Sequence, residues 1–160
     1  YRSWEQFMIR VHGVGNCSHG SEWSAVMTFL PWSDDYKVNI RVIDNEHRAL
    51  FDLVNALHQE ISHGKGEQII GSTLGALIRY TDEHLSNEEK YMRQCGFPGL
   101  ARHVTEHERF AQTVRRYKQQ FDADPDSLNT DNLLNTLKNW ITSHVLKSDQ
   151  EMAPYLRGEK

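Results

Sequence analysis

The chain has few cysteines, few prolines and no long apolar run. Of its 160 residues only 2 are cysteine and 4 are proline, and no run approaches the roughly 20 apolar residues of a membrane span. Cys17 and Cys95 lie far apart in no paired motif, so we expect two free thiols, as in a reducing cytoplasm. The first residues also lack the charged and apolar segments of a secretory leader. The sequence therefore predicts a cytoplasmic protein that does not cross a membrane.

The charge balance excludes a second group of functions. The formal net charge is -4, and the 18 lysines and arginines are scattered, which argues against a nucleic-acid partner or an anionic membrane surface. Hydrophobic residues make up 38% and charged residues 25% of the chain, as in an ordinary globular domain. The length fits one domain with a proper core.

Four long segments carry apolar residues at the three- and four-residue spacing of a helix. They run from about 44 to 62, 67 to 94, 100 to 121 and 131 to 147, with Asp44 as the expected N-cap of the first. All four prolines fall outside the expected helices, at Pro31, Pro98, Pro125 and Pro154. Short links between long amphipathic helices predict an all-α, antiparallel up-down-up-down four-helix bundle.

The rest of the chain divides around this bundle. Residues 1–28 show no sustained period and are expected to form an N-terminal extension, which contains His12, His19 and a candidate start at Met27. Residues 29–40 read as an N-terminal arm packed along the bundle. We expect the bundle domain to cover 29–153 and a C-terminal tail to cover 154–160. The role of the extension stays open.

A set of potential metal ligands lies on the apolar stripes of all four helices. It consists of five histidines and two carboxylates: His47, His84 and Glu88, His103 and His107, His144 and Asp149. Residues four apart on a helix are about 40° apart around its axis, so each such pair can point to one place. A single histidine on an apolar face is usually structural. Two buried carboxylates without compensation would cost several kcal/mol each, so the whole set predicts a two-metal site.

Asp149 is the weakest geometric step, because it follows His144 by five residues. That offset places it about 140° round a regular helix. It can join the site only if the last helix ends or bulges there, and a single π-turn would suffice.

The ligand count predicts an unequal pair of metals. If Glu88 and Asp149 bridge the metals together with a solvent oxygen, five histidines must divide as three and two. One metal is then six-coordinate and the other keeps an open position, as a ligand-binding site requires. Imidazole and carboxylate together suit Fe, Zn, Mn or Cu. Because the ligands bind deprotonated, we expect metal loss in acid. His58 and His63 are expected to be structural and solvated, respectively.

These motifs resemble the hemerythrin family, specifically its single-domain bacterial branch. The resemblance covers residues 30–149, and the matching pieces are Trp32, Tyr36-Lys37-Val38, Ile43-Asp44-Asn45-Glu46-His47, Leu50-Phe51, His84-x-x-x-Glu88-Glu89, His103-x-x-x-His107 and Trp140-Ile141-x-x-His144-x-x-x-x-Asp149. Two positions depart from the family pattern. Leu85 stands where a Phe is common, and Asn39 stands where a Gly is common.

The resemblance implies two Fe ions in a non-haem, oxo- or hydroxo-bridged centre that binds O2 reversibly. By the family pattern, one iron is held by His103, His107 and His144, and the iron with the open position is held by His47 and His84. Glu88 and Asp149 bridge the two. The side chains expected to line the O2 pocket are Leu85, Trp140, Ile141 and Val145.

The leading functional hypothesis is therefore an O2-binding protein for oxygen carriage, storage or delivery, and not an enzyme. No catalytic base beside the site is free of a ligand role. An alternative is an O2- or redox-sensing domain of a signalling protein. A di-iron enzyme acting on peroxide or NO is the weaker alternative, because such enzymes on ferritin-like bundles carry Glu-x-x-His pairs and more carboxylates.

Overall fold

The structure, a computed structural model, describes residues 28–160 of the chain, and these form an all-helical bundle. Its four long helices are α2 (Arg41–Ser62), α3 (Glu67–Cys95), α4 (Leu100–Ala123) and α5 (Thr130–His144). The shorter elements are 3₁₀ turns at Asp34–Tyr36 and Pro125–Ser127, a π-helical segment at Val145–Asp149, and α6 (Gln150–Leu156). No strand occurs between residues 28 and 160. The predicted all-α four-helix bundle is confirmed.

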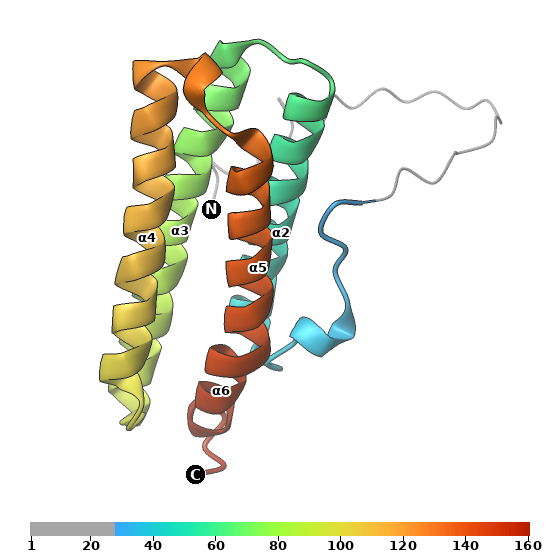
Figure 1. Ribbon diagram of the computed structural model, residues 1–160. Coiled ribbons are helices and arrows are strands. Elements are labelled where there is room, and N and C mark those ends of the chain that lie inside the picture. Colours follow the sequence, from blue (N-terminus) through green and yellow to red (C-terminus); the bar gives the residue numbers. More distant parts are fainter. Residues whose placement is uncertain (1–27) are drawn as a thin grey trace, which may run out of the picture.

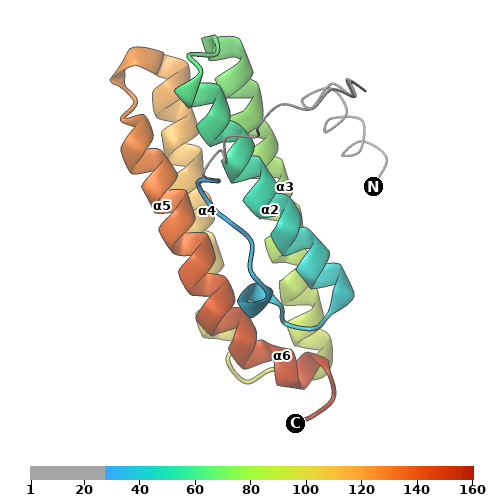
Figure 2. The ribbon, with the colours of Figure 1, turned by 90° about the vertical axis from the view of Figure 1, so that its right-hand side faces the viewer.

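Successive helices run in opposite directions, and α3 packs between α2 and α4 (Figure 1). α5 completes the bundle beside α4 and α2 (Figures 1 and 2). This antiparallel order brings the start of α2, the second half of α3, the first half of α4 and the end of α5 to one end of the molecule. Six of the seven predicted ligands lie in those four stretches, and Asp149 lies in the π-helical segment directly after α5.

Two apolar layers enclose that end of the bundle. The larger layer fills the half near the α2–α3 and α4–α5 links, and its fully buried side chains include Leu57, Leu74, Leu77, Leu133 and Leu137. The smaller layer lies at the α6 end and includes Val38, Ile43, Met92, Met152 and Ala153. The predicted ligands occupy the level between the two layers, because each helix passes from one layer to the other through its ligand positions.

The N-terminal arm lies over the junction of α2 and α5 (Figure 2). The side-chain amide of Asn55 on α2 makes two hydrogen bonds to the backbone of Leu30. Its Oδ1 accepts from the Leu30 N–H at 2.8 Å, and its Nδ2 donates to the Leu30 carbonyl at 2.9 Å. Lys138 of α5 donates to the Phe29 carbonyl at 3.0 Å. The arm is therefore attached to both helices, as the apolar pattern of residues 29–40 predicts.

The first helix begins three residues earlier than expected, at Arg41, with Ile40 at its N-cap. The prediction that Asp44 is the N-cap was wrong. Asp44 lies inside the first turn, and its Oδ1 accepts a hydrogen bond from the Val38 N–H at 2.8 Å. Between these residues Asn39 has φ 59°, a left-handed conformation that Asn tolerates better than other residues with a side chain. This explains how Asn39 stands where the family commonly has Gly.

The last helical segment corrects another expectation. Pro154 was predicted to lie outside the helices, but it lies inside α6, and α6 extends to Leu156, past the expected domain boundary at 153. A proline removes one helical hydrogen bond, and burial of Met152 and Ala153, at 0% and 1% exposed, offsets that loss. Among the described residues no helix combines the length and apolarity that a bilayer crossing requires.

Candidate metal centre

The structure brings all seven predicted ligands together in the bundle interior, and none has more than 4% of its surface exposed. They form two groups of atoms that could each hold a cation. One group comprises Glu88, His103, His107 and His144, with ligand atoms within 4.8 Å of one another, and the other comprises His47, His84 and Glu88. Glu88 belongs to both groups.

Glu88 divides its two oxygens between the groups. Its Oε1 lies 3.4 Å from Nε2 of His47 and 3.6 Å from Nε2 of His84. Its Oε2 lies 3.3 Å from Nε2 of His107 and 3.8 Å from Nε2 of His103. A carboxylate placed in this way can bridge two cations.

Asp149 repeats this arrangement from the other side. Its Oδ2 lies 3.1 Å from Nε2 of His47. Its Oδ1 lies 3.3 Å from Nε2 of His103 and 3.2 Å from Nε2 of His144. Glu88 thus contacts two histidines through each oxygen, and Asp149 contacts one through Oδ2 and two through Oδ1. Each carboxylate lies between the group of His47 and His84 and the group of His103, His107 and His144.

The π-helical segment Val145–Asp149 resolves the five-residue offset between His144 and Asp149. A π-turn inserts an additional residue into the helical turn, so Asp149 rotates back to the face that carries His144. Asp149 is 0% exposed as a result. The sequence predicts that Asp149 can join the site only if the helix ends or bulges after His144, and the structure has a π-helical bulge there.

The polar atoms at the centre of the cluster form few hydrogen bonds with one another and are better suited to binding a cation. Both oxygens of Glu88 and Asp149, both ring nitrogens of His47 and Nδ1 of His103 are buried without an aligned hydrogen bond among the described residues. Nε2 of His144 lies 3.0 Å from Nε2 of His107 and 3.1 Å from Nε2 of His103. Buried polar groups are normally satisfied, and imidazole nitrogens with carboxylate oxygens are a ligand set for transition metals.

The electrostatics of these seven side chains point the same way. Burial lowers the pKa of His47, but the carboxylates of Asp149 and Glu88 outweigh it and raise the pKa to about 10. His103 follows the same pattern, with burial opposed by Asp149 and Glu88, and its pKa rises to about 9. Burial raises the pKa of Glu88, yet His84, His103 and the other imidazoles hold it well below its usual range. The two carboxylates therefore require positive charge beside them, from protons or from metal ions.

Three glutamates that the sequence reading did not assign hold the outer nitrogens of three histidines. Nδ1 of His84 is 3.1 Å from Glu46 Oε2, and Nδ1 of His107 is 3.2 Å from Glu89 Oε1. Nδ1 of His144 lies 3.3 Å from Oε2 of a third glutamate, Glu106. A carboxylate at Nδ1 favours the tautomer that leaves Nε2 free to bind a metal, and it orients the ring.

Each of these glutamates is the sequence neighbour of a ligand on one helix and contacts a ligand on the next. Glu46 precedes His47 on α2 and reaches α3, Glu89 follows Glu88 on α3 and reaches α4, and Glu106 precedes His107 on α4 and reaches α5. Asn87 and Ser148 in turn donate to Glu46 and Glu106, at 2.8 and 2.6 Å. An acidic residue directly beside His47, Glu88 and His107 was the available sequence signal.

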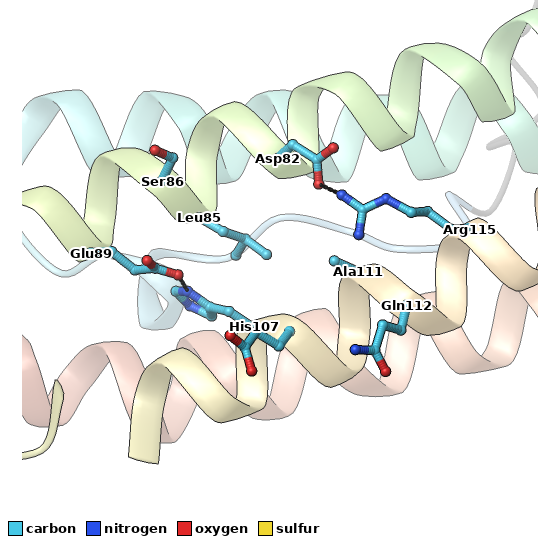
Figure 3. A pocket seen from close by; sticks show the side chains of 9 residues that line it. Asp82, Leu85, Ser86, Glu89, His107, Ala111, Gln112 and Arg115 are labelled. Atoms are coloured by element: carbon cyan, nitrogen blue, oxygen red, sulfur yellow. Dashed lines mark hydrogen bonds and ion pairs between the residues drawn. The ribbon is translucent and has the colours of Figure 1, made fainter. Parts of the chain in front are cut away.

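An open groove of about 380 Å³ lies between α3 and α4 and reaches the edge of the site. Figure 3 shows the Glu89 carboxylate against the His107 ring at one end of the groove and the Asp82–Arg115 ion pair, 2.6 Å long, at the other. Leu85 and Ala111 line the groove between them. Glu89 therefore connects a buried imidazole to a solvent-accessible surface.

The residues expected to line an O2 pocket lie around His144 and His84. Trp140 is half-buried and stacks on His144, with ring centroids 4.3 Å apart, and on Phe110 at 3.7 Å. The other three are buried apolar residues of the larger layer: Leu85, Ile141 and Val145, at 4%, 1% and 2% exposed. Their role as pocket walls stays a prediction.

The remaining histidines and cysteines divide between the described and the undescribed parts of the chain. His58 stacks on Phe29 with ring centroids 4.6 Å apart, and His63 is exposed with its Nδ1 2.7 Å from the Gln59 carbonyl. Neither belongs to the metal-ligand groups of the described residues. Cys95 is a half-buried free thiol. The other positions singled out in the sequence, His12, Cys17, His19 and Met27, lie outside the described residues.

The family comparison agrees with this geometry. Residues 38–156 match the family described as the hemerythrin HHE cation binding domain. Curated relatives named bacteriohemerythrin include one from Stenotrophomonas maltophilia, 31% identical over 82% of this chain and 84% of its own length. Another, from Methylococcus capsulatus, is 29% identical over 81% of this chain and 98% of its own.

Solved structures give the same answer for the fold. A crystal structure of wild-type hemerythrin superposes with a TM-score of 0.74 at 27% identity, covering 79% of this chain and 97% of that one. A point mutant of hemerythrin has a TM-score of 0.76, again at 27% identity, over 81% of this chain and 98% of that one. From the family match, the curated relatives and the shared bundle, we conclude that this chain belongs to the hemerythrin family.

Proposed function

We propose that this chain binds two iron ions in its bundle and uses them to bind O2 reversibly, as a cytoplasmic protein of oxygen carriage, storage or delivery. The observation that carries the proposal is the division of the two carboxylates. Glu88 and Asp149 each direct one oxygen toward a group of two histidines and the other toward a group of three. That arrangement suits two unequal metals held side by side.

Each ligand has a role in this proposal. His103, His107 and His144 would hold one iron, His47 and His84 would hold the other, and Glu88 and Asp149 would serve both. Because His47 and His84 supply one imidazole fewer than the other group, their iron would have room for a small ligand. When bound, ferrous iron supplies the electrons that O2 binding draws on.

The residues around the cluster favour binding over turnover. Ile141 and Val145, at 1% and 2% exposed, and the stacked ring of Trp140 keep water from the His144 side of the site. A dry apolar wall disfavours loss of a bound oxygen ligand to solvent. Glu46, Glu89 and Glu106 are occupied at Nδ1 atoms of the ligands. We therefore propose that the chain is not an enzyme.

One observation favours a sensing role as the second candidate. The segment that carries Asp149 is tied to the arm, since Gln150 donates to the Lys37 carbonyl at 3.0 Å and Arg157 to the Val38 carbonyl at 2.7 Å. A change at Asp149 on ligand binding could then alter how the arm is held. Limited proteolysis of the reduced protein with and without O2 tests this. A changed cleavage rate in residues 29–40 favours sensing, and identical rates favour carriage.

Iron analysis with visible spectra of the reduced protein, without and with O2, tests the main proposal. We expect two irons per chain and a spectrum that changes reversibly with O2. Fewer than two metals per chain after full reconstitution, or a visible spectrum that does not change with O2, would contradict the proposal.

His47→Ala provides the sharper form of the test. Because His47 contacts one oxygen of each bridging carboxylate, we expect loss of the iron with the open position and retention of helical content by circular dichroism. The matched control is His58→Ala, which removes an imidazole of α2 that stacks on Phe29 and should leave both irons in place. Collapse of the fold in the His47 variant alone would show that its role is structural.

A further inference from the structure

Thr81 is a buried hydroxyl that the fold itself does not use. Its side chain is 1% exposed, and Oγ1 has no hydrogen-bond partner among the described residues. Outside the seven ligands, only Trp32 Nε1 and Glu60 Oε2 share that state in the described part of the chain. Because leaving a buried polar group unpaired is unfavourable, such a group calls for an explanation.

Other threonines of this bundle show what a helical hydroxyl ordinarily does. Thr105, Thr113 and Thr142 each donate to the carbonyl four residues back, at 2.9, 2.8 and 2.9 Å. On α3 itself, the buried Thr73 donates to Glu60 Oε1 at 2.9 Å. Thr81 makes neither kind of bond. Its hydroxyl is therefore available to a partner in the interior.

The position of Thr81 on α3 places that hydroxyl next to the site. Thr81 precedes His84 by three residues and Glu88 by seven. It is therefore about 20° from Glu88 around the helix axis and roughly 4.5 Å, a little less than one turn, from His84 along it. Side chains of a helix lean toward its N-terminus, so the His84 ring leans toward the level of Thr81. Thr81 thus shares the inward face of α3 with both ligands.

The other helices contribute apolar side chains at the same distance from the ligands. Leu50 follows His47 by three residues, Ile141 precedes His144 by three, and Phe110 follows His107 by three. All three are at most 2% exposed and belong to the larger apolar layer. Within this first layer above the ligands, Thr81 supplies a hydroxyl where its counterparts supply hydrocarbon.

We propose that Thr81 donates a hydrogen bond to the small ligand bound at the open coordination position of the metal held by His47 and His84. This inference rests on the proposed function and adds a specificity-determining residue to it. The ligand class is a small molecule with an acceptor lone pair, namely O2 on the reduced protein, for which azide on the oxidised protein is a convenient probe. Thr81 then slows ligand release, and its unpaired hydroxyl is the consequence of keeping a donor ready.

The test compares Thr81→Val, Thr81→Ser and Thr73→Val in the full chain with both irons loaded. Valine matches threonine in shape but has no hydroxyl, so in Thr81→Val we expect azide affinity to fall, and O2 release to speed up, by about fivefold, the value of one ordinary hydrogen bond. Thr81→Ser keeps the donor and should remain near the wild type. Thr73→Val removes a hydroxyl from the same helix and should leave ligand binding unchanged.

Thermal unfolding of the metal-free proteins gives an independent reading. Because Thr81 Oγ1 has no partner to lose, Thr81→Val should unfold at the wild-type temperature or above it. Thr73→Val should unfold at a lower temperature, since it takes away the donor to the buried Glu60. A structural role for Thr81 predicts that both variants melt below the wild type.

The outcomes separate this inference from the proposed function. Unchanged azide affinity and O2 release in Thr81→Val, or a lowered unfolding temperature of its metal-free form, would overturn the role of Thr81 while leaving O2 binding intact. A wild-type protein that holds two irons but shows no response to O2 or azide would overturn the proposed function itself, and the role of Thr81 with it.

Discussion

The two halves of this bundle are built from the same four helices but are stabilised in different ways. The half near the α2–α3 and α4–α5 links buries hydrocarbon, with Leu57, Leu77 and Leu137 all at 0% exposed. The half near α6 buries five imidazoles and two carboxylates. Hydrocarbon is stable out of water by itself, whereas the buried carboxylates require a cation beside them.

This difference indicates that folding and metal binding are divided along the bundle. The apolar half and the small layer around Met92 and Met152 can hold the helices in register without a ligand. The seven candidate ligands between these two apolar layers then form a site that is already assembled before a metal binds. Four predictions test the division, from the largest expected effect to the smallest.

Glu88→Ala should have the largest effect on the polar half, because Glu88 contacts both groups of histidines. We expect iron per chain after reconstitution to fall from about two to none, with helical content retained. Elemental analysis and circular dichroism measure the two quantities. A variant that still holds two irons would show that Glu88 does not bridge.

Leu137→Ala should have the opposite profile in the apolar half. Removing a fully buried leucine costs about 2–5 kcal/mol of the free energy of unfolding, measured by denaturant titration of the metal-free protein at low temperature. The folded variant should still bind two irons. Ile69→Ala is the control, since Ile69 is 46% exposed and should change stability by less than about 0.5 kcal/mol. Loss of iron from folded Leu137→Ala would contradict the idea that folding and metal binding depend on different parts of the bundle.

The pH dependence of stability should distinguish metal-free from metal-loaded protein. In the metal-free protein the pKa of His47 is raised to about 10 and that of His103 to about 9, above the 6.5 of an unfolded histidine. Their contribution is therefore fully present below about pH 6.5 and is lost as the pH rises through 9 to 10. The pKa values of Glu88 and Asp149 are lowered, so their contribution is lost only as the pH falls below about 4.

Metal should reverse this profile, because the ions replace the imidazolium charge and the ligands bind deprotonated. We expect the loaded protein to keep its stability from pH 6.5 to 10 and to release metal in acid. Unfolding temperatures of both forms across this range test the contrast. Parallel curves for the two forms would contradict it.

Glu46→Gln should have the smallest effect, because Glu46 acts through His84. The amide keeps the shape but weakens the interaction with Nδ1, and we expect iron at that histidine to be lost to a chelator about tenfold faster. Glu83→Gln removes the same charge beside His84 in sequence, but Glu83 is exposed and forms no ion pair with a histidine of the described cluster. The two variants behaving alike would show a general charge effect instead.

Local features of the sequence were sufficient to predict the helices and the candidate ligands. Pairs such as His84 with Glu88 share a face by helical geometry alone, and short links make neighbouring helices antiparallel. The five-residue step to Asp149 called for an end or a bulge of the last helix, and the structure contains a π-helical segment at Val145–Asp149. These predictions succeeded because each depends on residues within a turn or two of one another.

Long-range contacts account for what the sequence reading missed. Glu46 meets His84 across 38 residues of chain, and Glu89 meets His107 across 18. Asp44 resembled an N-cap, yet it binds the backbone of Val38 in the arm. Pro154 was expected to end helical structure, yet the packing of Met152 and Ala153 keeps α6 continuous around it. Local propensity does not report which distant group a side chain will meet.

The sequence by itself determined that the chain forms four amphipathic helices with seven inward candidate ligands, because periodicity and spacing are local properties. Only the tertiary structure decided which oxygen of Glu88 and Asp149 faces which histidines, and which glutamates contact the outer nitrogens of His84, His107 and His144. It alone left the Thr81 hydroxyl buried without a hydrogen-bond partner among residues 28–160. The reason is physical: hydrogen bonding and burial depend on how separate helices pack, and that packing is settled by the whole core at once.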